Sequence, residues 1–153
     1  MDAHRSTRKV PVSVETCLNR EGNIALAEAL VAGLRSGVDP AELAKLFSRN
    51  VSFEIQGDED ILPWVGRRTG RAAAAEFFRN LHELTDTVRC NVDEILGSET
   101  RAVVVGDIAL RLRKTGRIFK SQFAINLTIG EHEVFRCQML GDTFNLSRVV
   151  RQL

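Results

Sequence analysis

The 153-residue sequence predicts an α+β fold, with a cone-like curved antiparallel sheet and three helices on its concave side. Two observations indicate this class. Apolar residues recur at helical spacing in three segments of the first half, whereas they alternate with polar residues in most segments of the second half. Short turns join the alternating segments, so consecutive strands run antiparallel, and helices segregated from an antiparallel sheet define the α+β class.

The three helices follow from their apolar spacing and their end signals. Residues 21–36 carry an apolar stripe, and Gly37 supplies a left-handed stop after it. A second helix begins at Pro40, where the missing N–H costs nothing, and runs to about residue 47. Residues 71–84 form the third helix, with one apolar side. Helices of this kind can pack on a single face of a sheet.

The strands follow from period-two alternation. Residues 51–56 form the first strand, and a turn-rich stretch, 57–70, leads from it to the third helix. Four further strands are expected at 88–96, 101–113, 117–129 and 134–144. A long curved sheet whose helices fill its concave side leaves a cavity at the open end. Residues 1–20 are predicted to be a flexible basic tail, and residues 21–153 a single domain.

The composition excludes several classes of function. A net charge of +1 gives no long-range attraction to nucleic acid or to an anionic membrane, and no apolar run is long enough to span one. The three cysteines are odd in number and none forms a C-x-x-C pair, which favours a reducing, cytoplasmic location. No metal-ligand spacing and no Gly-rich phosphate loop is present, so no metal or cofactor is expected.

Three segments resemble the nuclear-transport-factor-2-like superfamily, and more narrowly its SnoaL-like and ketosteroid-isomerase-like branch. They are Phe47–Phe53, then Leu62-Pro63-Trp64-Val65-Gly66 through Gly70-Arg71 to Phe77-Phe78, then Thr115-Gly116-Arg117 through Asp142-Thr143. The resemblance spans residues 22–150. It implies a pocket for a small, largely apolar organic ligand and a homodimer formed through the sheet.

The catalytic residues of the branch are only partly matched. The base carboxylate of ketosteroid isomerases falls on Ile55, their helix Tyr falls near Leu30, and their oxyanion-hole Asp falls near Asn126. The two Asp of limonene-epoxide-hydrolase-like enzymes fall near Asp107 and Asp142, and the Asp of polyketide-cyclase-like members resembles Asp142. Asp142 is therefore retained in the epoxide-hydrolase-like and polyketide-cyclase-like comparisons, while the helper residues are not.

Each Asp has two interpretations. Asp142 could act as a general acid or base in a dry pocket, or it could bond the backbone at a strand end. Asp107 lies in a strand of Val, Ile and Leu, which is costly unless the carboxylate is paired. It could line the pocket, re-aimed by a bulge at Gly106, or it could pair with an Arg of the next strand or face solvent.

The ligand-binding candidates are an aromatic loop residue, two strand amides and three apolar strand residues: Trp64, Asn126, Gln138, Phe53, Ile55 and Phe123. Trp64 could equally pack in the core, and the two amides could bond across strands. A final hairpin turn of two or four residues places Gln138 and Asp142 on the face of Phe123, with Asn126 opposite. An odd count reverses this arrangement.

Two functions follow. The first is binding of a small apolar molecule, with cofactor-free acid–base chemistry of an isomerase, cyclase or hydrolase type. Asp142 would transfer the proton and Asp107 would be its partner. The alternative is a non-catalytic ligand-binding or dimeric assembly domain. Two carboxylates in one enclosed cavity favour the enzyme, because close like charges cannot both ionise freely. Carboxylates on opposite faces of the sheet favour the alternative.

Overall fold

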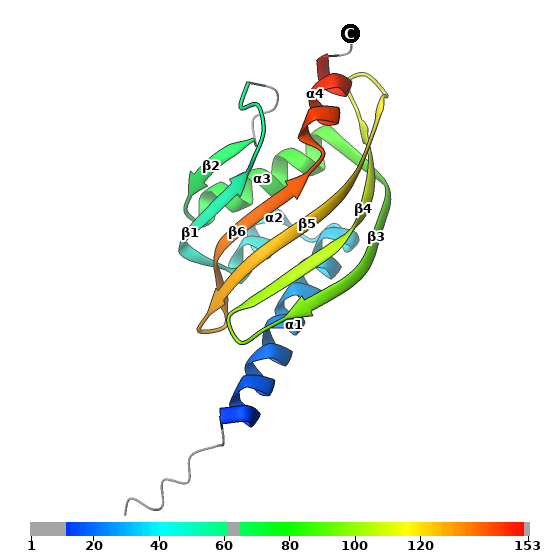
Figure 1. Cartoon of the computed structure of the whole chain (residues 1–153). Helices are drawn as coiled ribbons and strands as arrows, with labels where there is room; N and C mark the ends of the chain where they lie inside the picture. The colour runs from blue at the N-terminus through cyan, green and yellow to red at the C-terminus, as the bar shows by residue number, and fades with distance from the viewer. Residues whose placement is uncertain (1–11, 61–64, 152–153) are drawn as a thin grey trace, which may run out of the picture.

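The computed structural model describes residues 12–60 and 65–151, with side chains from Asn19 onward, and it confirms the α+β class. The elements in chain order are α1 (Val12–Ser36), α2 (Pro40–Leu43), the 3-10 turn η2 (Ala44–Leu46), β1 (Phe47–Ile55), β2 (Gly66–Thr69), α3 (Arg71–Leu84), β3 (Thr85–Gly97), β4 (Arg101–Leu112), β5 (Ile118–Gly130), β6 (Glu133–Gly141) and α4 (Thr143–Arg151). The strands form one curved sheet, and α1, α2 and α3 lie on its concave side (Figure 1). None of the described helices has both the length and the apolar character needed to cross a membrane.

The sheet is mixed, whereas a purely antiparallel sheet was expected. Its strand order is β2-β1-β6-β5-β4-β3, and β1 runs parallel to β6, with Ile55 opposite Met139. The other neighbouring pairs are antiparallel. The parallel pair joins the first and last strands, so no local turn signal announces it. Strand β2 lies within the predicted turn 57–70 and adds an edge beside β1.

Both ends of the domain are more helical than expected. Helix α1 begins at Val12, so it overlaps the predicted tail of residues 1–20, and residues 1–11 lie outside the described part. It ends as predicted at Gly37, whose φ of +71° is the left-handed conformation that favours glycine. At the other end, β6 stops at Gly141 and α4 follows, where a strand to residue 144 was expected.

Four phenylalanines fill one part of the concave side. Phe47 and Phe53 of β1 pack against Phe77 and Phe78 of α3, with ring centroids 5.1–6.3 Å apart. All four are at most 7% exposed. Tilted and edge-on ring pairs of this kind stabilise a core beyond the area that they bury. This aromatic cluster packs the sheet against α3. Phe77 also lines a cavity on the concave side of the sheet.

The last hairpin contains an extra residue. Its turn has two residues, Glu131 and His132, both with positive φ (50° and 66°), which matches the twist of the strands. After the turn Ile129 faces Val134, but Thr128 faces Arg136, so Phe135 is an unpaired bulge. The bulge shifts the register by one residue. Gln138 therefore lies beside Asn126, and the expectation that an even turn separates the two amides is wrong.

Gly106 lies where two backbones come unusually close. It pairs with Val92 of β3, next to a bulge at residue 93. A Cβ at position 106 would collide with the main-chain carbonyl of Asn91, which cannot swing away as a side chain could. The bulge suggested by this glycine is present, but it belongs to the neighbouring strand.

We expect Gly106→Ala to lower the free energy of unfolding by about 2 kcal/mol, because overpacking against backbone forces strands apart. The control is Gly22→Ala in α1, where a Cβ meets nothing within 4 Å. That change should raise the free energy of unfolding by about 0.5–1 kcal/mol, because Ala favours the helix. Urea denaturation followed by circular dichroism measures both. Equal effects at the two positions would contradict the close approach at Gly106.

Candidate functional site

A cavity of about 460 Å³ opens on the concave side, between the sheet, α1, α3 and α4. This size is typical of small-molecule sites. Alternation directs every second strand side chain toward the cavity, and Ala124 and Leu140, whose side chains alternate to the outer face, border it from the neighbouring positions. Most of the described lining is apolar: Val31, Leu34, Ile55, Phe77, Leu81, Val88, Val92, Ile108, Leu110, Leu112, Phe119, Phe123, Ala124, Ile125, Met139, Leu140 and Leu146.

The polar groups of the lining are few. They are Arg35 of α1, the β3 residues Thr85, Thr87, Arg89 and Cys90, Ser121 of β5, and Asp142 and Thr143 where β6 passes into α4. Several are already engaged. Thr85 donates its hydroxyl to the carbonyl of Leu81 at 2.6 Å, and Ser121 accepts the N–H of Asp142 at 2.8 Å. The described lining can therefore orient a ligand at a few points while offering it a mostly apolar wall.

Asp142 lines the cavity but also caps a helix. Its Oδ1 accepts the N–H of Asn145 at 2.9 Å, and its carbonyl accepts the N–H of Leu146 at 3.0 Å. The residue is exposed. An Asp at this position satisfies donors that the first helical turn leaves open. The structure thus shows the backbone-bonding interpretation of Asp142, while its role in proton transfer stays a prediction.

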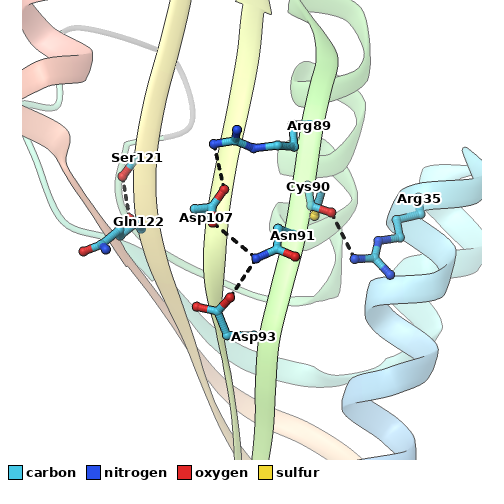
Figure 2. A network of polar contacts seen from close by, with 8 residues as sticks. All are labelled: Arg35, Arg89, Cys90, Asn91, Asp93, Asp107, Ser121 and Gln122. Atoms are coloured by element: carbon cyan, nitrogen blue, oxygen red, sulfur yellow. Dashed lines mark hydrogen bonds and ion pairs between the residues drawn. The ribbon is translucent and has the colours of Figure 1, made fainter.

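Asp107 does not line the cavity, so the predicted pairing with Asp142 is corrected. Its carboxylate lies 2.9 Å from Nη2 of Arg89 and accepts a 3.3 Å hydrogen bond from Nδ2 of Asn91 (Figure 2). The Asn91 amide also bonds Asp93 at 2.7 Å. Oδ1 of Asp107 receives no well-aligned hydrogen bond, so its partner is the charge of Arg89. This is the cross-strand Arg pair that the sequence left open.

Asn126 and Gln138 also lie away from the cavity, on the outer face. Arg101 donates to Oδ1 of Asn126 at 3.1 Å, and Asn126 donates to Oε1 of Gln138 at 3.1 Å. Gln138 in turn donates to Glu54 at 3.3 Å, and Arg67 lies 3.4 Å from the same carboxylate. The bulge at Phe135 explains the error, because it brings both amides to the same outer face. They bond across strands and do not face a ligand.

Some of the remaining predicted ligand contacts line the cavity and others do not. Ile55 and Phe123 line the cavity as expected. Phe53 does not, because it is 2% exposed within the aromatic cluster. Trp64 lies outside the described residues. The sequence prediction missed Arg35, Ser121 and the α4 contribution of Leu146. A signal for α4 existed, since Leu146, Val149 and Val150 have helical spacing, but the preceding strand pattern obscured it.

The cysteines offer no activated nucleophile in the described structure. Cys137 is fully buried in the core, and this burial raises the pKa of its thiol to about 12. A thiol with such a pKa stays protonated near neutrality and is unreactive. Cys90 is half-buried at the cavity edge, and its carbonyl accepts a hydrogen bond from Arg35. Among the described side chains, no group of three His, Cys, Asp or Glu residues could hold a metal ion.

Comparisons with known proteins agree with this architecture. The family model of the SnoaL-like domain matches residues 27–132. No curated protein sequence matches the chain. Among solved structures, an NTF2-like protein from Burkholderia xenovorans LB400 has a TM-score of 0.75 at 22% identity, covering 86% of this chain and 97% of that one. Bal32a, from a soil-derived mobile gene cassette, gives 0.73 at 20% identity, covering 87% and 99%.

A third solved structure was determined with a small molecule. It is a protein with a ketosteroid isomerase-like fold from Catenulispora acidiphila DSM 44928, in complex with trimethylamine. It has a TM-score of 0.62 at 14% identity and covers 74% of this chain and 82% of that one. At these identities the solved structures establish the fold alone.

The capping role of Asp142 predicts a difference between two substitutions. Asp142→Ala removes the acceptor for the Asn145 N–H, so the free energy of unfolding should fall by about 1 kcal/mol. Asp142→Asn should stay within about 0.5 kcal/mol of the parent protein, because an Asn side chain caps equally well. Urea denaturation of the three proteins measures the difference. A loss as large in Asp142→Asn as in Asp142→Ala would show that the charge, and not the cap, stabilises α4.

Proposed function

The chain belongs to the SnoaL-like domain family, and from its cavity we propose that it binds a small, largely apolar organic molecule. The observation that supports this proposal most directly is the space of about 460 Å³ bordered mainly by apolar side chains of α1, α3, α4 and five strands. Side chains that line a cavity of this size lack the dispersion contacts that they would make in a close-packed interior. A ligand of matching shape would supply these contacts.

Ile55 and Phe123 are the sequence-predicted ligand contacts that this proposal retains. Both lie in the cavity wall, and Phe123 faces Gly141 on the neighbouring strand. Each Å² of apolar surface removed from water contributes about 25 cal/mol. A ligand that covers these walls would therefore gain its affinity mainly from apolar burial, and the polar rim would set its orientation.

Binding is better supported than acid–base catalysis. Asp142 is the one carboxylate in the described lining, and it is exposed and bonded to the α4 backbone. Asp107 faces away and is paired with Arg89. A general base works within hydrogen-bond reach of its proton, and the rest of the described lining contains no second carboxylate. Proton transfer by Asp142, of an isomerase, cyclase or hydrolase type, remains a second candidate because this carboxylate does reach the rim.

We expect Ile108→Trp to weaken binding of the neutral fluorophore N-phenyl-1-naphthylamine at least tenfold, because the indole would occupy the cavity that Ile108 lines. The matched control is Leu96→Trp on β3, a position 49% exposed and absent from the lining. Fluorescence titration gives both affinities. If the control weakens binding equally, or if Ile108→Trp has no effect, the fluorophore does not occupy this cavity.

We further propose that the outer face of the sheet joins two copies of the chain. The described helices α1, α2 and α3 cover the concave side and leave the outer face of the sheet without a helix (Figure 1). On the outer face, Val105, Ala124 and Leu140 form one apolar row across β4, β5 and β6. The polar row of Asn126 and Gln138 lies directly beside it. Leu140 is 43% exposed. An apolar row bordered by polar side chains is typical of protein interfaces.

The expected oligomer is a homodimer, measured by light scattering at micromolar protein concentration. Ala124→Asp should give a monomer, because it places a charge in the centre of the apolar row, where two symmetry-related carboxylates would meet. Ala29→Asp, at an exposed position of α1, should remain dimeric. A monomeric parent protein, or a dimer that Ala124→Asp leaves intact, would overturn the proposed interface.

A further inference from the structure

We infer that the ligand is an apolar acid whose carboxylate binds Arg35 at the cavity mouth. This inference rests on the proposed binding function and adds the chemical class of the ligand. Arg35 lies in the last turn of α1 and lines the cavity. It is therefore a cation at the edge of a mainly apolar space, an arrangement that suits an amphipathic anion.

Within the described part of the chain, the guanidinium of Arg35 makes one hydrogen bond. Its Nη2 donates to the main-chain carbonyl of Cys90 at 3.0 Å, so the side chain extends from α1 to β3 (Figure 2). A guanidinium carries five N–H donors. One bond to a neutral carbonyl orients the group and leaves donors for a carboxylate, which a guanidinium can bind with two parallel hydrogen bonds.

Arg35 differs from the other cation of the described lining in its charged neighbours. The other cation of the described lining, Arg89, is neutralised by Asp107 at 2.9 Å. Among the described residues, Arg35 takes part in none of the ion pairs between basic and acidic side chains. The carbonyl end of α1 favours a cation at this position but does not replace a carboxylate partner. Arg35 is thus the lining cation with charge available for a ligand.

A second charged residue of the lining, Asp142, affects the orientation of a bound acid. The carboxylate of Asp142 stands at the start of α4, where it would repel an anionic group. A bound acid would therefore direct its carboxylate toward α1 and β3. Its apolar body would lie against Leu110, Phe119 and Phe123 on the inner face of the sheet.

The test compares two probes of the same shape, 2-naphthoate and the neutral 2-naphthamide, by calorimetric titration at neutral pH and low salt. The parent protein should bind naphthoate about tenfold more tightly than naphthamide, as expected for a charge-assisted bond at a partly exposed site. Arg35→Gln should remove this preference while changing the naphthamide affinity less than twofold. Arg35→Lys should keep part of it, and high salt should reduce it. The control is Arg20→Gln, on the same helix and outside the lining.

The outcomes separate this inference from the binding function. Equal affinities for the two probes, unchanged by Arg35→Gln, would overturn the role of Arg35 and leave the cavity as a binding site. Equal weakening of both probes by Arg35→Gln would show that Arg35 only supports the wall, which also overturns the inference. If neither probe binds the folded parent protein, both the binding proposal and this inference fail for compounds of this class.

Discussion

The position of one extra residue, Phe135 in β6, decides which side chains of the last strand reach the cavity. In a strand, neighbouring side chains point to opposite faces, so a shift of one residue exchanges the two faces completely. The bulge places Met139 on the inner face beside Ile125 and sends Gln138 outward to Asn126. Because β1 pairs with β6, the same shift sets which β1 side chains share a face with them: Ile55 lies beside Met139, and Glu54 beside Gln138. The apolar lining and the polar outer row are therefore two results of one register.

The two aspartates considered as a catalytic pair have separate partners. Asp107 faces Gln122 on the neighbouring strand and bonds to Arg89 and Asn91 on β3, so its burial cost is offset locally. Asp142 follows the last strand residue and completes the first turn of α4. Each carboxylate has a structural task, and neither needs the other. A cavity without a carboxylate pair retains the shape of the family fold while favouring binding over proton transfer.

Local patterns predicted much of the fold, and distant contacts account for what was missed. The periodicity of 71–84 matches α3, and Gly37 ends α1 as its left-handed conformation requires. The parallel pairing of β1 with β6 has no local signal, because the strands are joined through the rest of the sheet. The Phe135 bulge has none either, since Val134, Phe135 and Arg136 read as an ordinary strand. Site prediction depends on knowing the face of each strand residue, so Ile55 and Phe123 were correctly placed while Asn126 and Gln138 were not.

Helix α4 adds a wall to the cavity where the last strand ends. Its Leu146 is 8% exposed and contributes to the lining, while Asn145 donates to the carbonyl of Lys120 at 3.2 Å. At its far end Arg151 forms a 2.6 Å ion pair with Asp58, in the loop after β1. That ion pair is exposed and contributes little by itself, so burial of Leu146 is the main contact that holds α4 on the sheet. Helix α4 thus borders the cavity without being part of the sheet. Changes in its apolar residues would alter the size of the site without disturbing the sheet that supports it.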